Sequence, residues 1–125
     1  EFEISGIKDP IVKYPLQSNK IDMSNRDYIN FSWQGDDKID YYILEFYNSK
    51  TKKLLSRLKT KGNQFVFNDL FKLDEGKFYW TIQGFKKRQD GSTFKTELIK
   101  NEFIIYLSEK PDIPDLKTKD KIYIE

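Results

Sequence analysis

The chain of 125 residues contains no cysteine and no histidine. Without cysteine there is no disulfide framework and no thiolate chemistry, and without histidine the commonest general base and transition-metal ligand are missing. No apolar run approaches the ~18 residues of a membrane helix, and no signal-peptide pattern is visible. These absences argue against an enzyme and against a membrane span in this stretch, and we expect an excised domain of a larger protein.

Charge is abundant but nearly balanced, with 22 basic and 20 acidic residues and a formal net charge of +2. This balance gives no reason to expect nucleic acid as a partner. Aromatic residues make up 16% of the chain, and rings of this size fill the space between two sheets with few side chains. Since a chain of this length buries a core without metals or disulfides, we expect one domain.

Segments that alternate apolar and polar residues recur roughly every 8–12 residues between turn signals. The clearest lie at 28–33, 40–47, 53–58, 65–67, after Gly76 and at 93–106, with a bend expected near Lys100 and Asn101. Weaker strands are predicted at 11–14 and 21–23, and Pro15 places the first of them at a sheet edge. A helix at 50–60 is an alternative that the short distance between turns disfavours. The pattern predicts an all-β sandwich of about seven antiparallel strands.

The stretch from Leu73 to Phe85 is predicted to contain the central strand, after a turn at 74–76. Because side chains alternate between the two faces of a strand, each strong segment divides into an inner and an outer set. The predicted inner residues are Ile29, Phe31, Trp33, Tyr42, Leu44, Phe46, Phe78, Trp80, Ile82 and Gly84. The outer set of the central strand then contains Tyr79, Thr81, Gln83 and Phe85.

Four patterns together resemble the fibronectin type III superfamily, and in particular its bacterial envelope variants, over about residues 10–107. They are Ile29-x-Phe31-x-Trp33, Tyr42-x-Leu44-x-Phe46, Leu73-x-x-Gly76-x-Phe78-x-Trp80-x-Ile82 and Phe103-x-Ile105. The resemblance implies an immunoglobulin-like sandwich with strands A, B and E in one sheet and C, C′, F and G in the other. Strand C corresponds to 40–47, F to the strand after Gly76, and G to 93–106. These are patterns of core residues, so they imply a fold and not a function.

One position departs from the family pattern. Glu75 replaces the proline that usually precedes the glycine of this turn, and the family's corner tyrosine is then Tyr79 by spacing or is replaced by Phe78 by alternation. We favour Phe78, because this keeps Trp80 inside. A phenylalanine has no hydroxyl group, so the tyrosine-corner hydrogen bond would be absent.

The resemblance places the sandwich in residues 1–107, with 1–26 forming edge strands whose limits the pattern does not define. Residues 108–125 contain Pro111 and Pro114 and have the composition of a linker or tail, with a short strand at 122–124. The likeness to envelope proteins implies an extracytoplasmic location, in the periplasm or cell envelope.

The outward residues of strands C and F form a candidate binding face, defined as Tyr41, Ile43, Tyr47, Tyr79 and Phe85. Thr81 lies among them, and Ile104 and Tyr106 of strand G adjoin them. An exposed patch with this many rings is typical of a contact surface. It contacts another part of the same protein or a separate partner, or its exposure is fortuitous.

A basic cluster without an acidic residue contains Lys50, Lys52, Lys53, Arg57 and Lys59, followed by Lys61. Such a cluster attracts an anionic polymer, but lysines on an edge strand also prevent edge-to-edge pairing, which is the more frequent reason for them. A second cluster, at 86–88, is expected at the opposite end of the sandwich.

Three carboxylates, Asp36, Asp37 and Asp40, lie in the loop before strand C. Oxygen ligands of this kind suit Ca²⁺, but the spacing matches no calcium-binding loop and Lys38 lies among them. We therefore expect a solvated acidic loop, and no metal or cofactor.

We predict a non-catalytic module of a larger envelope protein, which spaces other domains or contacts a protein partner or neighbouring domain through its C–F–G face. The alternative is a module that binds carbohydrate or a cell-wall polymer. No nucleophile elbow, glycine-rich phosphate loop or paired-carboxylate motif is present in the sequence, so an enzyme is the least supported interpretation.

Overall fold

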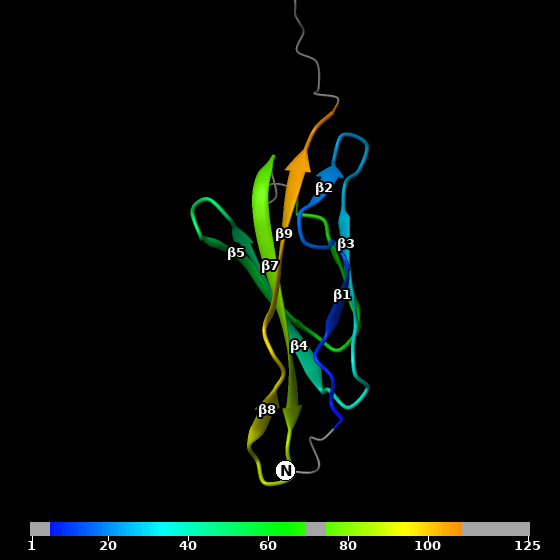
Figure 1. Ribbon diagram of the computed structural model, residues 1–125, viewed down its shortest axis with the longest axis vertical. Helices are drawn as coiled ribbons and strands as arrows, with labels where there is room; N and C mark the ends of the chain where they lie inside the picture. The colour runs from blue at the N-terminus through cyan, green and yellow to red at the C-terminus, as the bar shows by residue number, and fades with distance from the viewer. Residues whose placement is uncertain (1–5, 70–74, 109–125) are drawn as a thin grey trace, which may run out of the picture.

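A computed structural model describes residues 6–69 and 75–108 of the chain (Figure 1). The predicted tail after residue 108, with its strand at 122–124, lies outside the described residues. The same holds for residues 1–5 of the predicted domain, for position 73 of the family pattern and for position 74 of the predicted turn.

Nine strands form two facing sheets in this part of the chain. The smaller sheet has the order β1-β3-β6, and the larger has the order β2-β9-β7-β4-β5, with β8 pairing with β7. The bounds are β1 Ile11–Tyr14, β2 Asn19–Asp22, β3 Ile29–Gln34, β4 Tyr41–Asn48, β5 Leu54–Thr60, β6 Gln64–Phe67, β7 Gly76–Lys87, β8 Thr93–Lys95 and β9 Ile99–Tyr106.

This architecture confirms the predicted all-β sandwich and the division of its strands between two sheets. Strands β1, β3 and β6 take the places of A, B and E, and strands β4, β5, β7 and β9 take those of C, C′, F and G. The described residues contain no helix, so the alternative at 50–60 is wrong, and β5 occupies most of that range. One pair departs from the antiparallel pattern, because β2 runs parallel to β9.

The chain changes sheets between β1 and β2. Strand β1 pairs with β3 and ends at Tyr14, immediately before Pro15, which has no N–H to donate to a ladder. A turn follows, in which the Asn19 side chain accepts a hydrogen bond from the Leu16 amide at 2.7 Å. The edge position predicted for residues 11–14 is confirmed, and β2 is free to join the opposite sheet.

The predicted last strand, 93–106, is interrupted at residues 96–98, whereas β9 continues without a break through Lys100 and Asn101. Thr96 explains this interruption. Its Oγ1 accepts a hydrogen bond from the Gly84 amide at 2.9 Å, and its own amide donates to the Gly84 carbonyl at 3.0 Å. This buried side chain therefore satisfies the backbone of β7 where β8 has ended and β9 has not begun.

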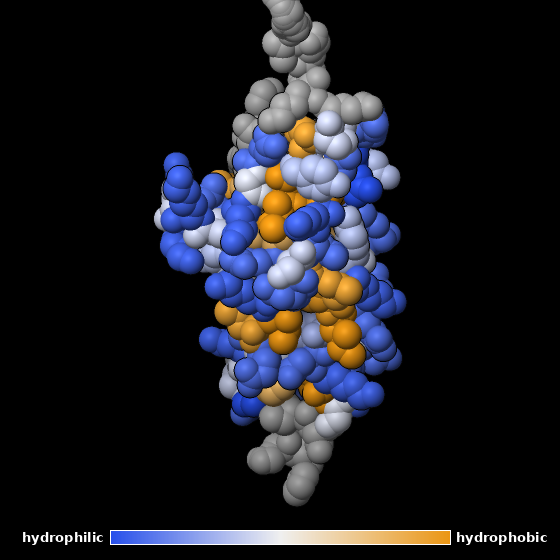
Figure 2. Space-filling model, turned by 45° about the horizontal axis from the view of Figure 1, so that its top comes forward, coloured by the Kyte–Doolittle hydropathy of each residue, from blue (hydrophilic) through white to orange (hydrophobic). Residues whose placement is uncertain are grey.

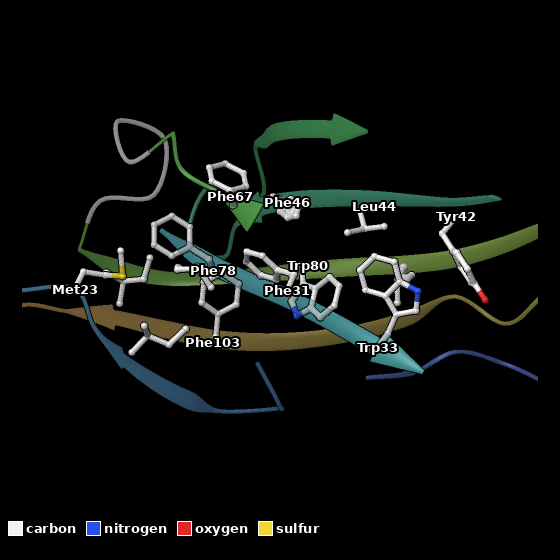
Figure 3. Close-up of a cluster of buried hydrophobic side chains, with 14 residues drawn as sticks. Met23, Phe31, Trp33, Tyr42, Leu44, Phe46, Phe67, Phe78, Trp80 and Phe103 are labelled. Atoms are coloured by element: carbon white, nitrogen blue, oxygen red, sulfur yellow. The ribbon is translucent and has the colours of Figure 1, made fainter. Parts of the chain in front are cut away.

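The core lies between the two sheets and is largely aromatic (Figure 3). Phe31 of β3 is at its centre, with ring centroids 4.8 Å from Phe46, 5.0 Å from Trp80 and 5.6 Å from Phe103, all edge to face. This is the preferred geometry for aromatic pairs. The inner residues predicted from alternation are all buried, which confirms the division of the strands into two faces.

Phe78 lies inside, 3% exposed, with its ring centroid 5.8 Å from that of Phe103. Tyr79 is on the opposite face of β7, where it pairs with Tyr47. The prediction from alternation is therefore confirmed at this position. Phe78 occupies the position of the family's corner tyrosine.

Candidate functional site

The pairing of β4 with β7 assembles the candidate binding face. The two strands are antiparallel, with Tyr41 opposite Phe85 and Tyr47 opposite Tyr79. Ile43 lies between these pairs and faces Gln83. All five predicted residues are half-buried and share the outer face of the larger sheet. The structure thus brings together the residues that alternation selected.

The first ring pair stacks nearly face to face. The centroids of Tyr41 and Phe85 are 5.2 Å apart, and the planes differ by 11°. Lys59, on the neighbouring strand β5, places its Nζ 4.3 Å from the centroid of Tyr41. An ammonium group at this distance is attracted by the negative face of the ring, so a cation covers one end of the stack.

The second ring pair repeats this arrangement at the other end of the face. Tyr47 and Tyr79 stack with centroids 4.7 Å apart and planes at 12°. Lys100, on β9, places its Nζ 4.2 Å from the centroid of Tyr79, and Lys52 lies farther away at 5.8 Å. Each ring pair therefore has a lysine ammonium group from a neighbouring strand over one of its rings, Lys59 of β5 or Lys100 of β9.

Glu45 connects the second ring pair to strand β5. Its carboxylate accepts a hydrogen bond from the Tyr47 hydroxyl at 2.7 Å and another from Arg57 Nε at 2.9 Å. The hydrogen bond to Glu45, supported by burial, raises the pKa of Tyr47 to about 12. Arg57 balances the charge of Glu45, so the lysines of this face are left with little opposing charge from β4.

The face is therefore not a bare apolar patch. Rings and lysines alternate across it, and Ile104, opposite Lys77, continues it on β9. In the view of Figure 2, apolar side chains likewise lie in separate areas between hydrophilic ones. The sequence did not predict that Glu45 would bind Tyr47 and Arg57, or that Lys100 would lie over Tyr79. Lys100 was placed at a bend, although simple alternation back from Ile104 would have directed it to the outer face.

The basic cluster divides between two environments. Lys52 and Lys59 lie over tyrosine rings and Arg57 pairs with Glu45, whereas Lys50 and Lys53 are exposed in the β4–β5 hairpin. The second cluster, at 86–88, lies at the end of β7, directly after Phe85, which pairs with Tyr41 at the start of β4. The predicted separation therefore holds only for the hairpin lysines, at the far end of β4. Lys59 is opposite Ile43, near the same end of β4 as residues 86–88.

The acidic loop uses its carboxylates to hold backbone amides. Asp36 accepts hydrogen bonds from the amides of Lys38 at 2.9 Å and Lys8 at 2.8 Å, and these bonds lower its pKa. Asp40 accepts from the Lys87 amide at 2.7 Å. A hollow of about 420 Å³ adjoins this loop and is lined in part by Tyr42 and Lys61. Within residues 6–69 and 75–108, no group of three or more acidic, histidine or cysteine side chains is placed to hold a metal ion.

Comparison with known proteins yields two similarities, and no family model matches the chain. An uncharacterized protein of Treponema pallidum (strain Nichols) is 29% identical over 77 residues, which is 62% of this chain. The matched segment is only 11% of the length of that relative. The fibronectin(III)-like modules of Clostridium thermocellum CbhA are similar in structure, with a TM-score of 0.41 and 15% identity over 77% of this chain and 93% of that one. Within the described residues, no helix is long and apolar enough to cross a membrane.

Proposed function

We propose that this domain is a non-catalytic module of a larger protein and that it binds a protein partner through the outer face of β4 and β7. The observation that carries the proposal is the presence of two stacked ring pairs on one face of the larger sheet, Tyr41 with Phe85 and Tyr47 with Tyr79. Rigid rings present much contact area at a small entropic cost, and tyrosine is enriched in protein interfaces.

The face has the dimensions of the central part of a protein interface. The two pairs are six residues apart along β4, which corresponds to roughly 20 Å of extended chain. A patch of that length across three strands covers roughly 300 Å². A stable protein interface covers about 800 Å² on each partner, so this face would form its centre, with the surrounding surface as the rim. Because the rings are half-buried and stacked in pairs, ordering them on binding costs less than ordering fully exposed side chains.

A second candidate is the binding of an anionic glycan or cell-wall polymer. The specific observation in its favour is that each ring pair has a lysine over it, Lys59 on Tyr41 and Lys100 on Tyr79. Rings and cations side by side suit a polymer that carries both apolar sugar faces and negative charge. An extracytoplasmic location belongs to the same proposal, and protease treatment of intact cells that express the full-length protein tests it.

The test of the first candidate uses the immobilised domain and extracts of its source organism. The variants Tyr41→Ala and Tyr79→Ala are expected to fold, by circular dichroism, and to lose a protein that the wild type captures. The matched control is Tyr28→Ala, because Tyr28 is 49% exposed and precedes β3 of the other sheet. Equal capture by all three variants would rule out the outer face as the contact.

Titration with soluble cell-wall fragments distinguishes the second candidate from the first. Binding is monitored through the amide chemical shifts of the domain. Movement of the Tyr41, Tyr47 and Tyr79 signals, lost at high salt, supports glycan binding. Flat titration curves at these residues would remove it, whatever the result of the capture experiment.

A further inference from the structure

Strand β5 is an open edge of the larger sheet. Among the described residues it pairs with β4 and with no other strand. The β4–β5 hairpin also projects from the side of the sandwich (Figure 1). On the unpaired side of an edge strand, backbone N–H and C=O groups are available to another extended chain.

The charge of this edge is strongly one-sided. Residues 48–68 contain six cations and no acidic residue. Because the whole chain has 22 basic and 20 acidic residues, the remainder carries 16 basic against 20 acidic. The domain is thus polarised, with its positive charge gathered at the hairpin, at β5 and at the turn after it. The six cations are Lys50, Lys52, Lys53, Arg57, Lys59 and Lys61.

Half of these cations have no partner of opposite charge or aromatic ring within the part of the chain that the structure describes. Lys52 and Lys59 lie over rings and Arg57 pairs with Glu45. The other three, Lys50, Lys53 and Lys61, are exposed. They border the edge at both ends, since Lys53 precedes β5 and Lys61 follows it.

Positive charge on an edge strand repels a second copy of the same edge. The same charge attracts an extended segment of opposite sign, and Leu54 at the start of the strand is 45% exposed and offers an apolar contact. We propose that β5 accepts an extended segment of a protein partner, rich in Asp and Glu, as an added strand of the larger sheet. In such binding, the main chain supplies affinity and the side chains supply selectivity. The inference goes beyond the proposed function, because it uses the edge of the sheet and not its outer face.

The experiment uses three synthetic peptides of ten residues and the intact chain. The first peptide alternates Glu and Val, the second alternates Lys and Val, and the third is the first with prolines in place of alternate valines. The acidic peptide is expected to bind and to slow amide hydrogen exchange in β5. The lysine peptide is expected not to bind. The proline peptide keeps the charge but cannot pair as a strand, so it is expected to bind at least about tenfold more weakly.

Charge reversal supplies the matched control. The double variant Lys53→Glu, Lys61→Glu is expected to weaken binding of the acidic peptide by about tenfold or more at low salt. The control is Lys13→Glu with Lys20→Glu, since both lysines are exposed on strands β1 and β2, away from this edge in the strand order. The control is expected to bind as the wild type does.

Three results would overturn the inference: equal binding of the acidic and proline peptides, unchanged exchange in β5 on binding, or equal weakening by both double variants. Tyr79→Ala separates this inference from the proposed function. Tyr79→Ala is expected to leave peptide binding unchanged. Loss of binding in that variant would show that the peptide binds to the outer face and not to the edge of the sheet.

Discussion

Replacing Trp80 with alanine tests the central strand most directly. The side chain is 1% exposed and its ring lies 5.0 Å from Phe31, 6.3 Å from Phe46 and 6.4 Å from Trp33. Its Nε1 donates a hydrogen bond to the Pro15 carbonyl at 3.4 Å. Trp80→Ala therefore removes a large buried surface, leaves a cavity among three rings and frees a carbonyl acceptor.

Removal of a buried tryptophan typically costs about 3–5 kcal/mol of unfolding free energy. A domain of this size has a total unfolding free energy of about 5–15 kcal/mol. The variant is therefore expected to remain folded, with little stability left. The assay is urea denaturation followed by far-ultraviolet circular dichroism. Tyr28→Ala, on an exposed residue, is expected to cost under about 1 kcal/mol. A loss below about 1 kcal/mol for Trp80→Ala would mean that the faces of β7 have been assigned wrongly.

Trp33 provides a comparison in which the same side-chain volume is removed at two buried sites. It is also 1% exposed, but its Nε1 is buried without a hydrogen-bond partner among the described residues. Trp33→Phe removes a donor that is unsatisfied, whereas Trp80→Phe removes one that is bonded. Trp33→Phe is therefore expected to cost about 1 kcal/mol less than Trp80→Phe. The reverse order would contradict the assignment of the two indole environments.

Three further predictions concern single contacts. Gly35→Ala is expected to destabilise by about 1–3 kcal/mol, because a methyl group there would overlap the buried hydroxyl of Tyr42; Gly62→Ala, with no atom nearer than 3.9 Å, is the control in the same urea assay. The hydrogen bond from Ser108 holds the pKa of Asp22 well below its ordinary value, so Asp22 favours folding above the unfolded-state pKa of about 4. The difference in unfolding free energy between wild type and Asp22→Asn should shrink as the pH falls below that value, and a gap that does not change with pH would refute this. In an ultraviolet pH titration, Tyr47 should ionise at about 12 and closer to 10 in Glu45→Gln; an unshifted Tyr47 would show that this carboxylate is not the cause.

Local patterns were sufficient for the faces of the strong strands. In β3, β4 and β7 the large apolar residues recur at every second position, and an alternation of this kind needs only the direction of successive Cβ atoms. The burial of Phe31, Phe46 and Trp80 follows from that rule. The same rule selected the rings of the outer face, because these occupy the remaining positions of two neighbouring strands.

The same patterns do not predict which strands pair when the two strands are distant in sequence. The parallel contact of β2 with β9 joins Ile21 to Ile105, and nothing local to either segment specifies it. The break at Thr96 also depends on a distant group, because its side chain binds the backbone of Gly84. Both features arise from hydrogen bonds that exist only once the sheets have assembled.

The sequence by itself determined which side chains of β3, β4 and β7 point into the core, since alternation is a property of each strand alone. It also determined the one-sided charge of residues 48–68. Tertiary structure alone decided that Tyr41 stacks on Phe85, that Lys59 and Lys100 cover the rings, and that β5 ends the sheet. The physical reason is that register and strand order depend on contacts between residues far apart in the chain, and the residue pattern within one strand carries no information about its neighbour.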